Sequence, residues 1–175
     1  MKIFLSWSGQ PSLNAAKVLE MWLPRLLQHV NPFISEEIEK GSRGLSVIAD
    51  ELNSTDYGII CLTHDNMASV WINFEAGALS KALESARVCP LLFGIKKMEV
   101  KGPINQFQMA YPQKDDFYLL LKSINEASGD KKIPENILAG TFSAMWSSIE
   151  ESFNIIIGEL SNNALELKTI EPEIK

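Results

Sequence analysis

The stretch Tyr57-Gly-Ile-Ile-Cys-Leu-Thr63 indicates the fold class of this chain of 175 residues. It is apolar on both faces and bounded by turn residues, which is typical of a strand buried at the centre of a parallel sheet. Three further short apolar runs, at residues 2–6, 31–35 and 88–93, are predicted to be strands of the same sheet.

Apolar residues at helical spacing occupy the segments between these strands. The first helix is predicted over residues 15–29, with a cap at Ser12 or Asn14 and a kink, or a new helical piece, at Pro24. Further helices are expected at residues 45–52 and 71–83. Because strand and helix alternate with short connections, the sequence predicts an α/β fold with a mostly parallel sheet covered on both faces.

The alternation weakens beyond residue 95. Residues 105–109 are predicted to be a short edge strand and residues 115–125 a helix, and Pro134 is expected to begin a long amphipathic helix that ends near Leu160. One domain is therefore expected over residues 1–160, followed by a tail or linker over residues 161–175.

Composition limits the classes of function. A hydrophobic content of 46% with 22% charged residues is typical of one globular domain. The net charge of −6 and the lack of a basic stripe argue against direct binding of nucleic acid. No apolar leader precedes the first strand and no apolar run approaches the roughly 18 residues that span a bilayer, so we expect a cytoplasmic protein without membrane contact. Cys61 and Cys89 lie in apolar runs and are expected to be buried free thiols, with a disulfide as the less favoured alternative.

An acidic residue stands out in the predicted helix Ser69-Val-Trp71-Ile-Asn-Phe-Glu75-Ala-Gly77. Trp71 and Glu75 are four residues apart, so both lie on one helical face and can border one cavity. That pairing suits a ligand with a flat ring and a developing positive charge. Two alternatives remain at this level: Glu75 facing water near a helix start, and Trp71 packed in the core.

Ligands of parallel α/β sheets bind beyond the carboxyl ends of the strands. The loops expected there are residues 7–14, 36–44 and 64–70. His64 and Asn66 border this edge, but a single histidine without a partner in the sequence is weak evidence of catalysis.

Other chemistries lack their motifs. The chain has neither the phosphate loop G-x-x-x-x-G-K-[ST], nor the redox dinucleotide motif G-x-G-x-x-G, nor the nucleophile motif G-x-S-x-G. Two histidines and two cysteines, far apart, make a zinc site improbable, and no metal is expected. A phosphoacceptor receiver needs acidic residues at the end of its first strand, where this chain has Ser6, Trp7 and Ser8.

Four segments together resemble a bacterial Toll/interleukin-1 receptor (TIR) domain, over roughly the first 95 residues. They are Ile3-Phe-Leu-Ser-Trp7, Phe33-Ile-Ser-Glu-Glu-Ile-Glu-Lys-Gly41, Gly58-Ile-Ile-Cys-Leu-Thr63 and the W-x-x-x-E pattern Trp71-x-x-x-Glu75. The resemblance implies a three-layer flavodoxin-like fold with a five-stranded sheet and an extra C-terminal helix. In the enzymatic branch it implies cleavage of the nicotinamide N-glycosidic bond of NAD+, giving linear or cyclic ADP-ribose in antiphage immunity.

The resemblance also implies roles for individual residues. Glu75 would stabilise the oxocarbenium-like transition state, and Trp71 would stack on a ring of the substrate. Further substrate contacts are expected from the end of the first strand and from the loop after the second. These residues are Ser6, Trp7, Ser8, Phe33, Ser35, Lys40, Gly41 and Arg43.

The sequence departs from its relatives at Ser8 and Gly9, where several of them carry cations. Lys40 and Arg43 are then the nearest cations for a pyrophosphate, although either can equally be a solvated surface residue. Trp7 is expected to be an exposed aromatic. Phe33 is expected either to wall the site or to pack beneath the loop.

NAD+ would be the substrate, so no cofactor is expected. Expected partners are further copies of the chain through TIR–TIR contacts, and a separate effector or an associated sensor. The alternative function is a TIR interaction module that scaffolds partners without chemistry.

Overall fold

A parallel sheet forms the centre of the computed structural model, which describes residues 1–34, 53–67 and 87–170. Its strands are β1 (Lys2–Ser6), β2 (Asn31–Ile34), β3 (Tyr57–Thr63) and β4 (Arg87–Phe93). All neighbours are parallel, in the order β2-β1-β3-β4. This confirms the α/β class and the four strands predicted from apolar runs.

Alternate residues along the strands enter two cores, one on each face of the sheet. Ile3 and Leu5 belong to one buried cluster and Phe4 to the other, and Cys61 and Leu62 of β3 divide in the same way. This is the period of two that a pleated strand imposes. All seven residues of β3 are buried, as expected for a central strand.

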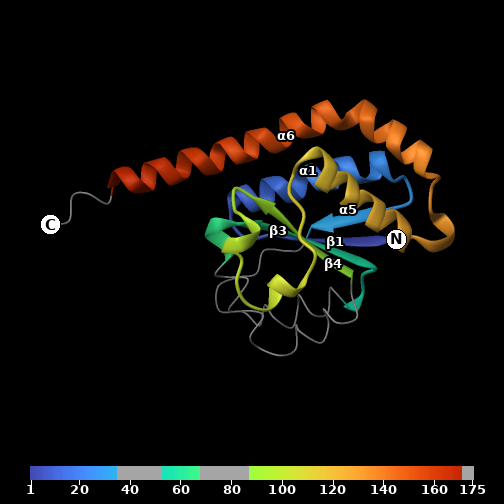
Figure 1. Ribbon diagram of the computed structural model, residues 1–175, viewed down its shortest axis with the longest axis horizontal. Coiled ribbons are helices and arrows are strands. Elements are labelled where there is room, and N and C mark those ends of the chain that lie inside the picture. The colour runs from blue at the N-terminus through green and yellow to red at the C-terminus, as the bar shows by residue number, and fades with distance from the viewer. Residues whose placement is uncertain (35–52, 68–86, 171–175) are drawn as a thin grey trace.

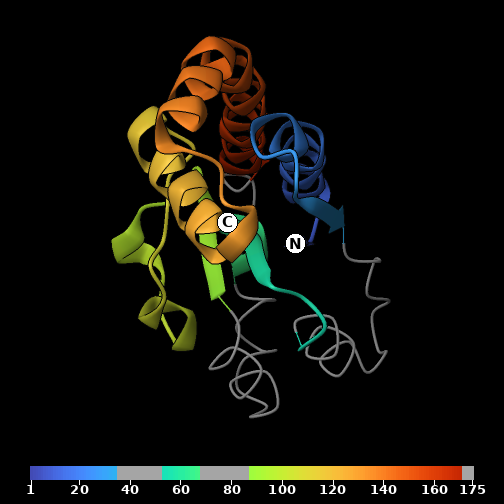
Figure 2. The same ribbon diagram turned by 90° about the vertical axis from the view of Figure 1, so that its right-hand side faces the viewer.

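Helices α1 (Gln10–Leu26), α5 (Lys114–Ala127) and α6 (Glu135–Ile170) lie together on one face of the sheet (Figures 1 and 2). Their contact is rich in aromatic rings. The Phe153 ring of α6 lies 5.1 Å from that of Phe117 in α5 and 5.6 Å from that of Phe93 in β4. The helix predicted at residues 115–125 is thus confirmed, as is Pro134 immediately before α6.

The start of α1 differs from the prediction. The helix begins at Gln10, not residue 15, and Gly9 stands before it with φ of 81° and no side-chain cap. Glycine tolerates this backbone conformation, and Pro11 is suited to a first helical turn. Ser12 is therefore inside the helix and does not cap it. Pro24 lies in the last turn, so α1 continues to Leu26 as one piece.

The predicted edge strand at residues 105–109 is wrong. Pro103–Gln106 forms a 3₁₀ helix, η2, and only Ala110 pairs with β4, through hydrogen bonds from Leu92 N to Ala110 O and from Ala110 N to Pro90 O, each 2.9 Å. The part of the chain that the structure describes thus contains four strands and one isolated parallel bridge beside β4. Proline at the start of this segment favours the 3₁₀ turn and cannot donate to a ladder.

Helix α6 continues to Ile170, ten residues beyond the predicted end near Leu160, because residues 164–168 are mostly strong helix formers and the next proline is Pro172. Its last turns extend beyond the body of the protein (Figure 1). The division of the chain at residue 160 stays a prediction, and it falls inside this helix. Within the described residues, no helix is both long and apolar enough to cross a membrane.

Candidate functional site

The carboxyl ends of β1 and β3 define the candidate site. The chain places β2 on one side of β1 and β3 on the other, so the strand order reverses between β1 and β3. In open α/β sheets ligands bind outside the strands' carboxyl ends at such a switch point. Ser6, Trp7 and Ser8, predicted to contact substrate, lie here at the end of β1.

Trp7 is half-buried and packs against the core cluster on the helix-covered face. The expectation of an exposed aromatic is therefore wrong. Trp7 continues the face of Ile3 and Leu5, whose period of two carries its ring toward the helices. Ser6 is also half-buried, whereas Ser8 is exposed.

Buried polar side chains join the two strand ends. Asn66, 2% exposed, accepts a hydrogen bond from Thr63 N at 2.8 Å and donates to Cys61 O at 2.9 Å and to Ser8 O at 3.2 Å. Ser12, fully buried in α1, donates to Cys61 O at 2.7 Å and accepts from Ser8 N at 3.2 Å. We call Ser12 and Asn66 the edge clamp.

Sequence reasoning missed the edge clamp. It interpreted Ser12 as a possible helix cap and noted Asn66 only as a neighbour of the strand edge. A buried amide is costly unless hydrogen-bonded, so the position of Asn66 three residues after the end of an apolar strand was the one available signal.

Phe33 lies near the carboxyl end of β2, the strand that pairs with β1. Its ring packs 5.6 Å from that of Phe4, and Lys2 Nζ lies 5.3 Å from its centroid. Phe33 contacts the core cluster on one face of the sheet and Trp7 the cluster on the other. The loop that both predicted roles of Phe33 involve lies outside the described residues, so both roles stay predictions.

The remaining predicted site residues lie outside the described residues. They are Trp71, Glu75, Ser35, Lys40, Gly41 and Arg43. Trp71 and Glu75 belong to the connection that leaves the carboxyl end of β3 and enters β4 at its amino end. The structure brings together only Ser6, Trp7 and Ser8 of the predicted set.

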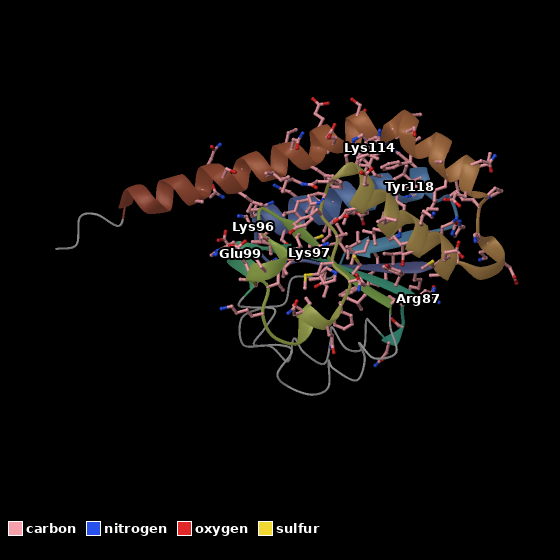
Figure 3. The ribbon with its side chains drawn as sticks, viewed as in Figure 1. Arg87, Lys96, Lys97, Glu99, Lys114 and Tyr118 are labelled. Carbon is pink, nitrogen blue, oxygen red and sulfur yellow. The ribbon has the colours of Figure 1, made fainter. Side chains whose placement is uncertain are left out.

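Two lysines follow β4 at the carboxyl edge. Lys96, Lys97 and Glu99 lie together at this end of the sheet, while Arg87 lies at the other (Figure 3). Lys97 Nζ is 3.6 Å from the Asp116 carboxylate and 5.0 Å from the centroid of the Tyr111 ring. Partly exposed pairs of this kind contribute little free energy, so this cluster is a surface feature and not a built anion site.

Both cysteines are buried and free, as predicted. Burial raises the pKa of the Cys61 thiol and raises that of Cys89 to about 12. A raised pKa disfavours the thiolate, which is the nucleophilic form of cysteine.

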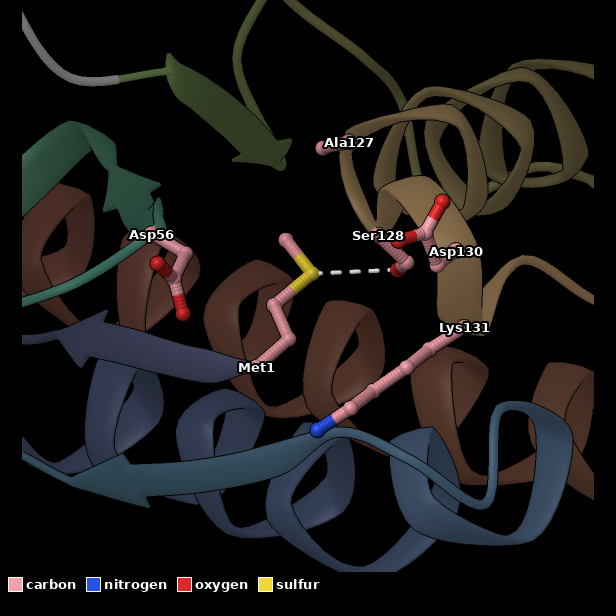
Figure 4. A pocket seen from close by; sticks show the side chains of 6 residues that line it. All are labelled: Met1, Asp56, Ala127, Ser128, Asp130 and Lys131. Carbon is pink, nitrogen blue, oxygen red and sulfur yellow. Dashed lines mark hydrogen bonds between the residues drawn. The ribbon is translucent and has the colours of Figure 1, made fainter.

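A cavity of about 310 Å³ opens at the opposite, amino edge of the sheet (Figure 4). Met1, Asp56, Ala127, Ser128, Asp130 and Lys131 line it. Ser128 Oγ donates to Met1 Sδ at 3.2 Å and lies 2.6 Å from His29 Nε2. This cavity contains none of the predicted site residues.

The protein is therefore of the parallel α/β class. Its candidate ligand site lies at the carboxyl edge of the sheet, at the β1–β3 switch point. Among the described residues, no group of three His, Cys, Asp or Glu side chains is placed to hold a metal ion. No protein-family model matches the sequence, and no curated protein matches it.

Proposed function

We propose that this chain is a TIR-domain enzyme that cleaves the nicotinamide N-glycosidic bond of NAD+, acting in the cytoplasm in bacterial antiphage defence. The observation that carries the proposal is the W-x-x-x-E pattern of Trp71 and Glu75 in the connection after β3, beside a switch point of flavodoxin-like order. The resemblance implies a fifth strand, and at its place beside β4 the described residues have the bridge at Ala110. Helices on the second face of the sheet are part of this proposal.

Cleavage of the nicotinamide N-glycosidic bond requires one carboxylate. Nicotinamide leaves as a neutral molecule, so its departure needs no general acid, and the positive charge develops on the ribose. Glu75 would stabilise that charge and bind the ribose hydroxyls. Trp71 would stack on the cationic pyridinium, a contact that contributes about 0.5 to 2 kcal/mol.

Substrate would be held at the switch point by Ser6, Trp7 and Ser8. Lys40 and Arg43 are the proposed contacts of the pyrophosphate, with Ser35 and Gly41 in the same loop. Phe33, which is half-buried and packs against Phe4, is the proposed wall of the site beside this loop.

Glu75→Gln tests the assignment directly. The substitution preserves size and removes the negative charge, so we expect nicotinamide release from NAD+ to fall by roughly 10²-fold or more. The measurement is chromatography of nicotinamide with the purified chain, at matched NAD+. Glu150→Gln, an exposed carboxylate of α6, is the control and should keep wild-type turnover. Undiminished turnover in Glu75→Gln would overturn the role of Glu75, whereas a wild-type chain that releases no nicotinamide would favour the scaffold module.

A further inference from the structure

We propose that Asn66 is a positioning residue that holds the β1–α1 loop, residues 7–9, in its substrate-binding conformation, with Ser12 as its partner. This inference rests on the proposed NAD+ cleavage. Neither side chain belongs to the site residues expected from the sequence.

Hydrogen bonds of the edge clamp fix the main chain of Ser8 at both of its polar groups. Ser8 N donates to Ser12 Oγ, and Ser8 O accepts from Asn66 Nδ2, each at 3.2 Å. Both clamp residues also donate to one atom, the carbonyl oxygen of Cys61. The end of β3 thereby holds the loop that follows β1.

The loop needs such a support because β1 has ended. The last pair of the β1–β3 ladder is Ser6 with Ile60, so Ser8 and Gly9 lie beyond the ladder. Gly9 adopts φ of 81°, and the space where a Cβ would lie contains no atom within 4 Å. Core packing holds Trp7 and a hydrogen bond of 3.0 Å from Leu13 N holds Gly9 O, and between them the edge clamp holds both main-chain polar groups of Ser8.

Ordering a binding loop before the ligand arrives lowers the entropic cost of binding. Asn66 is buried and touches main-chain atoms, so it acts on substrate through the loop. Loss of the clamp should therefore weaken substrate binding more than it slows the chemical step. The expected signature is an increase in KM with kcat nearly unchanged.

Asn125 provides a matched control for the loss of a buried amide. It is 3% exposed, and it donates to Ile133 O at 2.8 Å and accepts from Ile133 N at 3.0 Å. These bonds lie beyond the carboxyl end of α5, beside Ala127 and Ser128 of the amino-edge cavity. Asn125→Ala thus removes a similar buried amide away from the candidate site.

Steady-state kinetics of Asn66→Ala, Ser12→Ala and Asn125→Ala against NAD+ test the proposal. We expect KM to rise roughly tenfold in Asn66→Ala and less in Ser12→Ala, with kcat within about threefold of wild type, and no change in Asn125→Ala. Should Asn66→Ala fail to fold, Ser12→Ala is decisive, because α1 accepts alanine. An unchanged KM in the folded clamp variants, or an equal rise in Asn125→Ala, would overturn the proposal.

Amide hydrogen exchange of the peptide covering residues 6–13 separates the clamp from the proposed activity. We expect this peptide to exchange roughly tenfold faster in Asn66→Ala or Ser12→Ala and at the wild-type rate in Asn125→Ala. If the wild-type chain does not consume NAD+, the proposed function fails while faster exchange still supports the clamp. Exchange at the wild-type rate in the clamp variants overturns the inference on its own.

Discussion

At each edge of the sheet, one polar residue links different segments of the chain by hydrogen bonds. At the carboxyl edge Asn66 satisfies three main-chain atoms and links two segments. At the amino edge His29 joins the chain start to the end of α5: its carbonyl accepts from the N-terminal ammonium at 3.1 Å, and its ring lies 2.6 Å from Ser128 Oγ. The charges near the His29 ring are positive, so the stability of the protein depends on the protonation of His29 and hence on pH.

Stability should fall on acidification through the titration of His29. Burial, the N-terminal ammonium and Lys131 all lower the pKa of His29 from its usual value of 6.5. The unfolded chain therefore binds the proton first, and the free energy of unfolding decreases as pH falls through 6.5 toward the lower folded-state pKa. Thermal melts between pH 7 and pH 5 should show a larger loss for wild type than for His29→Gln. Parallel curves for the two proteins would contradict this prediction.

At the scale of the elements, helix α6 has one buried face and one exposed face. Phe153 is fully buried between β4 and α5, whereas Ile155, two residues later, is 59% exposed. A rotation of about 200° separates residues two apart on a helix, so their side chains meet different environments.

Phe153→Ala should destabilise the protein by about 3 to 5 kcal/mol, since it removes a buried ring and leaves a cavity. The melting temperature should fall by roughly 6 to 20 °C for a domain of this size. Ile155→Ala, the control, should change stability by less than about 0.5 kcal/mol. Comparable losses in the two variants would show that the buried face of α6 is assigned incorrectly.

Sequence patterns predicted strands better than helix ends. The four strands agree with their apolar runs because a buried strand needs a continuous apolar segment of its own length. The start of α1 and the end of α6 were missed because the first turn of α1 contains polar residues and the last turns of α6 extend beyond the packed core. Tertiary packing supplies most of the stability of a helix, so its end is a weak local signal.

For the whole molecule, we expect activity to depend on assembly. The described β1–α1 loop carries no cation at Ser8 or Gly9 to hold a pyrophosphate, so we propose that a second copy of the chain contributes to the pocket. Nicotinamide release per chain should increase with protein concentration, or with an agent that clusters the chains. A rate per chain that is constant over a hundredfold dilution, at matched NAD+, would indicate a self-sufficient monomer.

The product should be mainly a cyclic ADP-ribose isomer. Cyclisation requires a nucleophile of the same substrate to reach the anomeric carbon before water does, which a closed aromatic pocket favours. Trp7 already lies half-buried at the candidate site, and the further proposed walls are Phe33, Trp71 and Phe74, the residue before Glu75. Chromatography of the active assembled enzyme distinguishes the products. Linear ADP-ribose alone would reverse this prediction and leave the role of Glu75 intact.

By itself, the sequence determined the α/β class, the four strands, the burial of both cysteines and the edge at which to look for ligand. Each follows from a local pattern of apolar residues and turns. Tertiary structure decided the strand order, the packing of Phe33 and Trp7, and the edge clamp. The Ser12–Cys61 and Ser8–Asn66 bonds join residues 49 and 58 positions apart. No local pattern encodes such contacts, because only the folded sheet brings the two strand ends together.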